Sequence, residues 1–332
     1  MNTLRWGLLS TAHINRRVIP AIRASRRGKL VAVASRDIEK ARQYAAEWEI
    51  PLAFGSYEEL LASDQVDVIY ISLPNSMHAE WTIKALEAGK HVLCEKPFAL
   101  SVDEVDRMIE TCRRTNRILA EGFMYLHHPQ TQLVGEYVRS GRLGEISLVR
   151  AMFSFILANR AGNIRLNSDY GGGSLWDVGI YPISYAQYIL QDLPQSVSGQ
   201  QWLGETGVEE SFVGQMSYSE GRVAQIASSF RLPYATSLEI YGSEGRLTLN
   251  RPFNGINEKE RSILFTSVDG KTEKLHVKSP ELYLGEIEDL HAAILDGKPI
   301  AVPLTVCRDH VQIACALYEA AQKNQIINIE QQ

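Results

Sequence analysis

The stretch His91-Val92-Leu93-Cys94-Glu95-Lys96-Pro97 is the part of the sequence that most clearly indicates the fold. A short apolar run, of the length of a buried strand, leads directly into a glutamate, a lysine and a proline. Charged residues at the carboxyl end of a buried strand are poorly placed for stability, but in an open α/β sheet this edge is where ligands bind. We therefore expect Lys96 to face a substrate.

The amino-terminal part of the chain repeats this alternation of strand and helix. Apolar runs of strand length occur at residues 4–10, 30–35, 66–72, 91–94 and 118–121. Helical patterns lie between them at residues 14–25, 37–49, 76–88 and 101–115, and capping boxes begin at Ser56 and Ser101. Strands that are apolar on both faces and alternate with helices indicate a parallel, doubly wound sheet. We predict an α/β protein with a dinucleotide-binding Rossmann domain over residues 1–122.

The pattern changes after residue 122. Helices are expected at 130–139 and 174–190, a long strand at 144–155, and closing helices at 280–295 and 303–323. Between them lie strand-like segments at residues 196–203, 211–218, 222–230, 237–241, 246–249, 262–266 and 273–277. Hairpin turns fit 219–221 and 243–245. We predict that residues 123–332 form an α+β domain with a large, mostly antiparallel open sheet.

Composition excludes several classes of protein. The chain has 332 residues, 45% of them hydrophobic and 22% charged, which suits a globular protein of two domains. A net charge of −5 argues against nucleic acid as a partner. No apolar window is long enough for a membrane span, and the amino terminus has no apolar signal core. The four cysteines lack Cys-x-x-Cys spacing, and no metal-ligand pattern is present, so we expect reduced thiols, a cytoplasmic location and no metal.

The first strand-to-helix turn is the expected phosphate site of a dinucleotide fold. It reads Ser10-Thr11-Ala12-His13-Ile14, with small residues where glycines usually stand. Such residues still permit close approach of the backbone to a phosphate, and the following helix supplies N–H donors. An ordinary tight turn explains the same residues, so this motif alone leaves both interpretations open.

The end of the second strand predicts which nicotinamide cofactor binds. NAD enzymes place an acidic residue there for the ribose 2′-hydroxyl, whereas an arginine accommodates a 2′-phosphate. This chain has Ser35-Arg36, and Asp37 follows as the expected helix N-cap. The residues favour NADP, with NAD as the second option; the alternative is a surface arginine that begins a helix.

Further cofactor contacts are expected at the ends of the next two strands. Leu73, Pro74, Asn75 and His78 follow the third strand, and Asn75 can both cap a helix and meet the cofactor. His78 falls in the first turn of that helix, where a structural role is the simpler interpretation. Glu95, with Lys96, completes the predicted cofactor-binding set.

A second cluster of polar residues follows the glycine run at 171–173. Asp177 and Tyr181 are four residues apart and share one face of a helix. Ser174 and Asp177 also fit a capping box, and Tyr181 fits an amphipathic core position. The strand-end lysine elsewhere in the chain favours the catalytic interpretation.

The sequence resembles the Gfo/Idh/MocA oxidoreductases over essentially its whole length. The resemblance rests on Glu95-Lys96-Pro97 after a strand and on the glycine run followed by Asp177, Gly179 and Tyr181. Tyrosine at 181, where many members have histidine, is similar to the branch containing glucose–fructose oxidoreductase, dimeric dihydrodiol dehydrogenase and NADP-dependent xylose dehydrogenases. Residues 121–129 and 163–165 resemble the same branch. The glycine-poor first turn departs from the family pattern.

The resemblance implies hydride transfer between NADP and a CH–OH or C=O centre of a sugar, keto-sugar or polyol. On this hypothesis Tyr181 exchanges the proton, Lys96 hydrogen-bonds the reacting oxygen and the nicotinamide ribose, and Asp177 orients them. Tyr125, His127 and Arg165 are candidates for gripping substrate hydroxyls. Alternatives are a dihydrodiol dehydrogenase and a non-catalytic NADP-binding regulator. The family also implies a homodimer or homotetramer through the carboxyl-terminal sheet.

Overall fold

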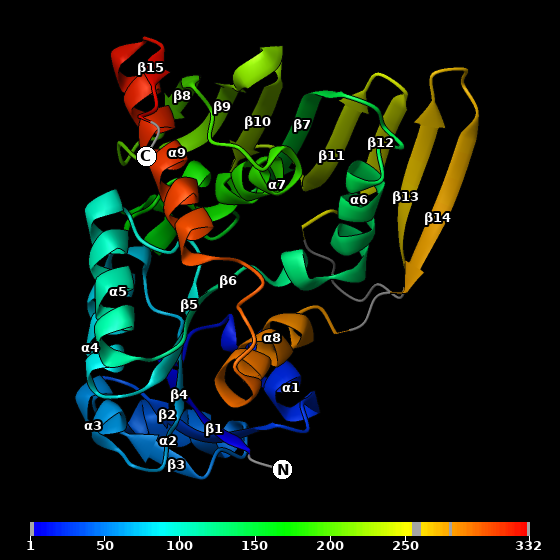
Figure 1. Cartoon of the computed structure of the whole chain (residues 1–332). Coiled ribbons are helices and arrows are strands. Elements are labelled where there is room, and N and C mark those ends of the chain that lie inside the picture. The colour runs from blue at the N-terminus through cyan, green and yellow to red at the C-terminus, as the bar shows by residue number, and fades with distance from the viewer. Residues whose placement is uncertain (1–2, 254–259, 279–280, 331–332) are drawn as a thin grey trace. The chain divides into compact units, whose positions relative to one another are not determined.

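The computed structural model describes residues 3–253, 260–278 and 281–330 (Figure 1). The chain divides into two compact units. Unit 1 comprises Met1–Met124 and Glu281–Arg308, and unit 2 comprises Tyr125–Pro280 and Asp309–Gln332. The chain first passes from unit 1 to unit 2 after Met124, close to the boundary expected after residue 122. The sequence prediction assigned 281–308 to the second domain, whereas the structure groups this segment with unit 1.

Unit 1 contains a parallel six-stranded sheet in the order β3-β2-β1-β4-β5-β6, which confirms the predicted doubly wound Rossmann sheet. The strands are β1 (Leu4–Leu9), β2 (Gly28–Ala34), β3 (Leu52–Phe54), β4 (Val68–Ile71), β5 (His91–Glu95) and β6 (Leu119–Gly122). The helices are α1 (Asn15–Ala24), α2 (Ile38–Glu47), α3 (Tyr57–Ala62), α4 (His78–Glu87), α5 (Val102–Thr115) and α8 (Leu284–Asp296). The edge strand β3 was not predicted, because three residues are too few to show a periodic pattern.

Local capping explains where several of these helices begin. Ser56 and Ser101 each accept a hydrogen bond from the backbone N–H three residues later, as the predicted capping boxes require. The glutamate of each box, Glu59 or Glu104, accepts from the residue before the cap rather than from the cap itself. Asp37 caps α2, as predicted.

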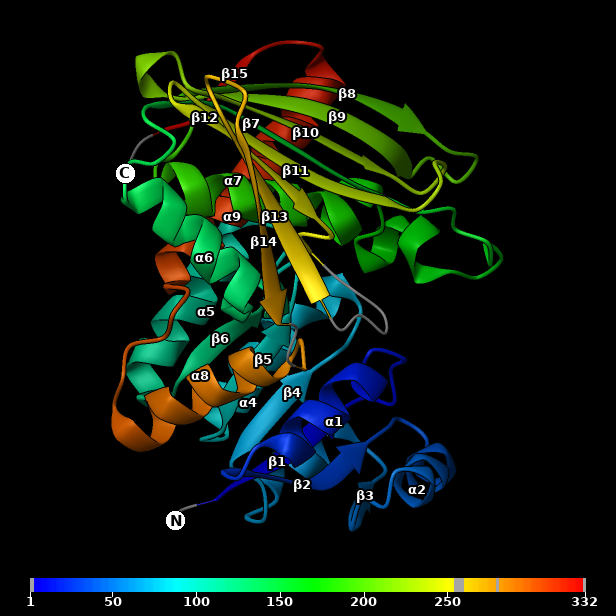
Figure 2. The ribbon, with the colours of Figure 1, turned by 90° about the vertical axis from the view of Figure 1, so that its right-hand side faces the viewer.

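Helix α8 belongs to unit 1 because one buried hydrogen bond and one exposed ion pair attach it there. The Trp6 indole N–H donates to His291 Nε2 over 2.9 Å, and Arg27 pairs with Asp296 over 2.8 Å. Figures 1 and 2 both show α8 beside α1. These partners are more than 260 residues apart in the sequence, so no local pattern reveals them.

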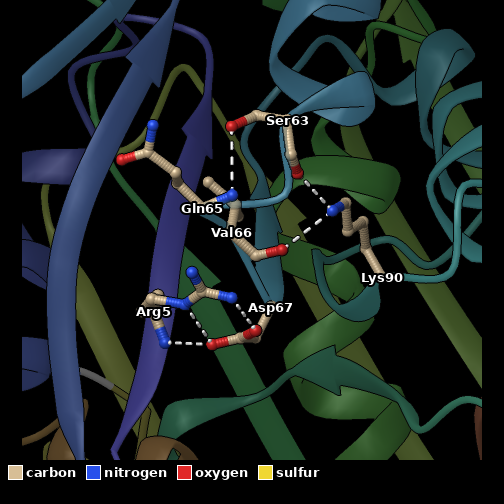
Figure 3. Close-up of polar contacts among 6 residues, drawn as sticks. All are labelled: Arg5, Ser63, Gln65, Val66, Asp67 and Lys90. Carbon is tan, nitrogen blue, oxygen red and sulfur yellow. Dashed lines mark hydrogen bonds and ion pairs between the residues drawn. The ribbon is translucent and has the colours of Figure 1, made fainter.

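The start of β4 is held by two sets of polar contacts, which Figure 3 shows. Arg5 contacts both carboxylate oxygens of Asp67, with Nε 2.9 Å from Oδ2 and NH2 2.6 Å from Oδ1. The Lys90 ammonium donates to the carbonyl oxygens of Ser63 and Val66, at 2.5 and 2.9 Å. Because β1, β4 and β5 are thereby fixed at their amino ends, their carboxyl ends line up in register at the opposite edge of the sheet.

Unit 2 contains a nine-stranded sheet in the order β14-β13-β12-β11-β7-β10-β9-β8-β15. All of its pairs are antiparallel except β7 with β10, which confirms the mostly antiparallel prediction. The strands are β7 (Ile146–Ser154), β8 (Ser196–Leu203), β9 (Glu209–Ser217), β10 (Val223–Ser229), β11 (Ala235–Gly242), β12 (Gly245–Asn250), β13 (Glu260–Ser267), β14 (Thr272–Lys278) and β15 (Ile327–Asn328).

Helices cover one face of this sheet, as Figure 2 shows. Helix α7 (Ile180–Leu190) packs on β7 and β10, and α6 (Pro129–Arg139) packs on β13 and β14. Strand β9 shows the resulting alternation, since Phe212 and Met216 are buried while Val213 is 61% exposed. The last long helix, α9 (Leu304–Lys323), begins in unit 1 and continues into unit 2.

Within the described part of the chain, no helix is both long and apolar enough to cross a membrane. The cysteines are free thiols, as expected. Among the described residues, no three or more histidine, cysteine or acidic side chains lie together where they could hold a metal.

Candidate active site

In the turn between β1 and α1, a serine adopts a backbone conformation that is usual for glycine. Ser10 adopts a φ of 147°, a conformation that residues with a Cβ rarely adopt. Its hydroxyl lies 2.9 Å from that of Ser72, and its carbonyl accepts from the Asn15 amide at 2.8 Å. The Ser72 hydroxyl in turn donates to Asn15 Oδ1 over 2.7 Å. This buried network compensates for the missing glycine.

The amino end of α1 is suited to an anion. No side chain caps the helix, and no acidic residue lies in its first turn. The N–H groups of Asn15 and Arg17 donate to the carbonyl oxygens of Ala12 and Ile14, and the helix dipole still favours an anion at this end. The small residues Thr11 and Ala12 precede His13 and Ile14 in this turn, and cofactor binding by residues 10–14 stays a prediction.

The end of β2 presents a cation, and the acidic residue after it caps the next helix. Arg36 is exposed, directly after the buried Ser35. The Asp37 carboxylate accepts from the backbone N–H groups of Glu39 and Lys40, so it is occupied in capping α2. Burial raises the pKa of Tyr57, and the nearby Arg36 guanidinium opposes that rise. Arg36 therefore lies beside a phenol at the strand edge.

His78 connects two loops at this edge. Its Nδ1 lies 2.7 Å from the Pro97 carbonyl oxygen and its Nε2 lies 2.9 Å from that of Leu73. Burial lowers the pKa of this ring, and the two carbonyl groups partly oppose that effect. The ring is thus a brace between the segments after β4 and β5, which agrees with the structural interpretation. Pro74 and Asn75 follow Leu73 at the same strand end, and Asn75 begins a short 3₁₀ turn.

Lys96 stands immediately after β5, where the sequence placed it. It is half-buried and is joined to Pro97 by a cis peptide bond. The adjacent Glu95 accepts a hydrogen bond from the hydroxyl of Tyr70, which is fully buried in β4. Burial raises the pKa of Glu95, while the charge of Lys96 and the Tyr70 hydroxyl act against it.

In unit 2, Asp177 pairs with Arg165. Arg165 Nε lies 2.6 Å from Asp177 Oδ2, and the charge of Asp177 is the largest cause of a raised Arg165 pKa. Asp177 lies in a π-helical turn (Leu175–Gly179) that leads into α7. The alternative capping box does not form, because the Ser174 hydroxyl donates to Glu209 and makes no cap bond.

Tyr181 lies in the first turn of α7 among aromatic rings. The rings of Phe153, Phe253 and Tyr125 have centroids 5.4, 5.7 and 5.8 Å from its own. Arg165 is close enough for its charge to interact with the Tyr181 phenol. The predicted neighbours Arg165, Asp177 and Tyr181 therefore form one cluster in unit 2.

Tyr125 and His127 are the other two predicted substrate contacts, and the Arg165–Asp177 ion pair does not include them. Tyr125 is fully buried, and its hydroxyl lies 2.6 Å from that of Ser184. Its ring stacks on Tyr185, with centroids 5.3 Å apart, so its visible role is packing. His127 is half-buried at the end of a 3₁₀ turn before α6.

Glu209 is a residue that the sequence did not single out. It is buried at the start of β9 and accepts hydrogen bonds from the Ser174 hydroxyl, the Leu175 N–H and the Tyr318 hydroxyl, at 2.5, 2.9 and 3.1 Å. Burial raises its pKa, and these donors oppose that shift. It fixes the start of the turn that carries Asp177. Sequence reasoning missed this residue, because nothing in the sequence links an acidic residue at the start of a strand to the turn at Ser174 and Leu175.

The predicted catalytic trio is divided between the units. Lys96 lies in unit 1, whereas Asp177 and Tyr181 lie in unit 2. Each half has its own supporting contacts: Tyr70 and Glu95 for Lys96, and Arg165 for Asp177.

Comparison with known proteins identifies both units. Residues 4–123 match the model of an oxidoreductase family with an NAD-binding Rossmann fold, and residues 131–248 match the GFO/IDH/MocA C-terminal domain. A D-xylose 1-dehydrogenase (NADP(+)) of Haloferax volcanii is 34% identical, covering 98% of this chain and 100% of its own. A trans-1,2-dihydrobenzene-1,2-diol dehydrogenase of Xenopus laevis is 32% identical, covering 96% and 97%.

A solved structure resembles the whole chain. KijD10, a 3-ketoreductase from Actinomadura kijaniata crystallised with NADP and TDP-benzene, superposes with a TM-score of 0.90 at 30% identity, covering 96% of this chain and 98% of its own. Variants of that enzyme that replace one lysine or one tyrosine have also been crystallised. With family models matching both units and relatives aligned over nearly the full length, this chain belongs to the Gfo/Idh/MocA oxidoreductase family.

Proposed function

We propose that this protein is an NADP-preferring oxidoreductase that transfers hydride between nicotinamide and a CH–OH or C=O centre of a sugar, keto-sugar or polyol. The observation that carries the proposal is the strand-end lysine. Lys96 lies at the carboxyl edge of a Rossmann sheet, where this fold binds its ligands, and the adjacent Glu95 accepts a hydrogen bond from the buried Tyr70.

The proposed preference for NADP rests on the edge of β2. A ribose 2′-hydroxyl would need a carboxylate there, and the acidic residue that follows Arg36, Asp37, uses Oδ1 to cap α2. The exposed guanidinium of Arg36 can instead pair with a 2′-phosphate. The xylose dehydrogenase relative carries NADP(+) in its name, and KijD10 was crystallised with NADP, which supports the same preference.

On the substrate side we assign a role to each polar group. Bound NADP(H) supplies or accepts the hydride. Lys96 hydrogen-bonds the reacting oxygen, and Tyr181 exchanges its proton with that oxygen. Asp177, held by Arg165, orients the pair. The first role that we assign to Arg165 is to hold Asp177. Contact of Arg165, Tyr125 or His127 with substrate hydroxyls stays a prediction.

A two-way assay tests the proposal. Nicotinamide absorbance is followed with NADP(H) and NAD(H), in oxidation and reduction, against aldoses, keto-sugars, polyols and TDP-linked keto-sugars. We expect turnover in at least one sugar class, with NADP(H) favoured in kcat/KM. Arg36→Ala should reduce that preference at least about tenfold, while Arg42→Ala, an exposed arginine on α2 paired with Glu39, leaves it unchanged. Tight NADPH binding without turnover on any substrate would favour a non-catalytic binding protein.

Dihydrodiol oxidation is the second candidate, because the Xenopus laevis relative is a trans-dihydrodiol dehydrogenase at similar identity. The aromatic surroundings of Tyr181 suit an unsaturated ring. Adding a trans-dihydrodiol to the same panel distinguishes sugar oxidoreduction from dihydrodiol oxidation. The class of compound with the higher kcat/KM identifies the function.

We also propose that the protein is a cytoplasmic homodimer or homotetramer. Free thiols support a reducing compartment. The face of the sheet that lacks helices in unit 2 exposes Trp202, Val213 and Ile326 and contains a groove of about 630 Å³. Exposed apolar surface of this kind is typical of a protein interface.

A further inference from the structure

A cluster of acidic and phenolic side chains lies inside unit 1, behind Lys96. Its members come from separate elements: Tyr70 from β4, Glu95 from β5, and Tyr283 and Glu286 from the segment that begins α8. The Tyr70 hydroxyl donates to Glu95 Oε1. Glu286 interacts electrostatically with Glu95 and with both phenols. The proposed function already includes the Tyr70–Glu95 hydrogen bond beside Lys96, whereas Tyr283 and Glu286 have no role in it.

Glu286 is the unusual member of this cluster. The residue is 3% exposed, and both carboxylate oxygens are shielded from solvent without a hydrogen-bond partner. An ionised carboxylate in that position would carry an uncompensated charge, which costs far more than a neutral acid. Because the oxygens are shielded, a ligand arriving from solvent has no access to them. The remaining way to relieve the cost is to bind a proton.

The charged neighbours favour the same outcome. The nearest charge acting on Glu286 is Glu95, and two carboxylates that share a buried site do not both ionise. The negative charge is more favourable on Glu95 than on Glu286, because Glu95 accepts a hydrogen bond from the Tyr70 hydroxyl and lies next to the positively charged Lys96. Burial raises the pKa of Glu286, with the Glu95 charge acting in the same direction. Two further charges lie at the margin of the cluster, since Glu121 of β6 interacts with Glu95 and Arg17 of α1 with Tyr283.

We propose that Glu95 and Glu286 form a carboxylate–carboxylic acid pair with a single negative charge, and that Glu286 holds the proton as a positioning residue for Lys96. The neutral acid allows Glu95 to stay ionised beside the lysine. Glu286 then adds no second negative charge beside Glu95. The single charge of the Glu95–Glu286 pair does not depend on the proposed function, whereas the role of Glu286 in catalysis rests on it.

Carbon NMR of the protein labelled at glutamate δ-carbons tests the charge state directly. We expect one carboxyl carbon to keep the chemical shift of a protonated acid at neutral pH. That signal should vanish in Glu286→Gln, which is neutral and similar in shape to the acid, and persist in Glu288→Gln. Glu288 lies on the same helix but is partly exposed. If every glutamate titrates in the ordinary acidic range, the proposal is wrong.

A labelling experiment tests the link to Lys96 without relying on turnover. Acetic anhydride is applied at pH 8, and mass spectrometry measures acetylation of the peptide that contains Lys96. Removing the charged member in Glu95→Gln should increase the Lys96 rate by roughly three- to tenfold, because an ammonium without its counter-charge loses its proton more readily. Glu286→Gln replaces a neutral group by a neutral group and should change the rate less than about twofold. An equal increase in both variants would show that Glu286 is ionised and overturn the assignment.

The pH profile of turnover then separates this inference from the proposed function. With any active substrate of the panel, Glu286→Gln should keep the wild-type profile, and Glu286→Ala should lower kcat by disturbing the packing under Lys96. If no substrate is turned over but the NMR signal is present, the acid pair stands and the proposed function fails. If turnover is present and the NMR signal is absent, the reverse conclusion holds.

Discussion

Arg165 Nε lies 2.6 Å from Asp177 Oδ2, at the turn that leads into the helix carrying Tyr181. The sequence predicted Arg165 as a substrate contact and Asp177 as an orienting group. Their pairing makes Arg165 the residue that fixes the orienting group. A misplacement of about 1 Å in a catalytic constellation can cost two orders of magnitude in rate.

We therefore expect Arg165→Ala to lower kcat/KM by roughly ten- to a hundredfold, with NADPH binding unchanged because the cofactor residues lie in unit 1. The measurement is steady-state kinetics together with NADPH fluorescence titration. Arg142→Ala is the matched control, since Arg142 is similarly exposed and pairs with Glu273 elsewhere in unit 2. Wild-type kcat/KM in Arg165→Ala would contradict the role of the pair.

Lys96→Met should lower turnover by about two or more orders of magnitude, because the variant loses its hydrogen bond to the reacting oxygen. NADPH should still bind, since the turn after β1 and the edge of β2 are untouched. Stopped-flow measurement of the hydride step, with cofactor binding measured separately, distinguishes loss of chemistry from loss of binding. Near-normal turnover would overturn the assignment.

Lys90→Met provides the contrasting control in the same unit. Lys90 donates to the buried carbonyl groups of Ser63 and Val66, and methionine leaves both without that donor. We expect the free energy of unfolding to fall by about 1–3 kcal/mol. The folded fraction should keep its kcat. Loss of kcat without loss of stability would mean that the two lysines had been assigned the wrong way round.

The sequence predicted those parts of the fold that local patterns determine. Apolar runs located all of the Rossmann strands except the three-residue β3, and Ser56, Ser101 and Asp37 cap their helices as expected. Lys96 was found at a strand end because a charge that follows a buried run is visible in one dimension.

Long-range contacts could not be predicted in this way. Helix α8 joins unit 1 through His291 and Trp6, which are 285 residues apart. The π-helical turn at Asp177 depends on Glu209, which belongs to another strand. Glu286 appeared as an ordinary acidic residue of a helix, because only the fold shows that its carboxyl is buried.

Ser10 gives a prediction about stability. Alanine at this position would keep the unfavourable φ and lose the hydroxyl contact with Ser72, whereas glycine would lose the contact but relieve the backbone. We expect Ser10→Ala to be the less stable variant, by about 1 kcal/mol relative to Ser10→Gly. Urea unfolding measures the difference. Equal stability of the two variants would show that the backbone at residue 10 carries no strain.

His291 predicts how stability depends on pH. Its Nε2 accepts from the Trp6 indole, and burial lowers its pKa to about 4 from an ordinary value of 6.5. The unfolded chain therefore takes up this proton at higher pH than the folded protein. Stability should be lost as pH falls from about 6.5 to 4, with a slope of at most about tenfold in the folding equilibrium per pH unit.

The check is a series of urea unfolding midpoints between pH 7 and pH 4. His291→Gln keeps a polar side chain at the position but does not titrate, so its midpoints should fall less steeply than those of the wild type. His276→Gln is the control, because His276 lies on the edge strand β14, outside the buried interior of unit 1. Parallel curves for wild type and His291→Gln would remove His291 as the source of the slope.

The uncovered face of the unit 2 sheet gives the last prediction. Val213 lies in the groove on this face and is 61% exposed, while its strand neighbours Phe212 and Gly214 face the covered side. If the face is an interface between copies of the chain, the wild type should be a dimer or tetramer by light scattering at micromolar concentration. Val213→Glu should then shift it towards the monomer, because a buried unpaired charge destabilises the contact. Val268→Glu is the matched control, since this valine is 75% exposed but follows β13 at a hairpin end. A monomeric wild type, or equal effects of the two substitutions, would exclude the sheet face as the interface.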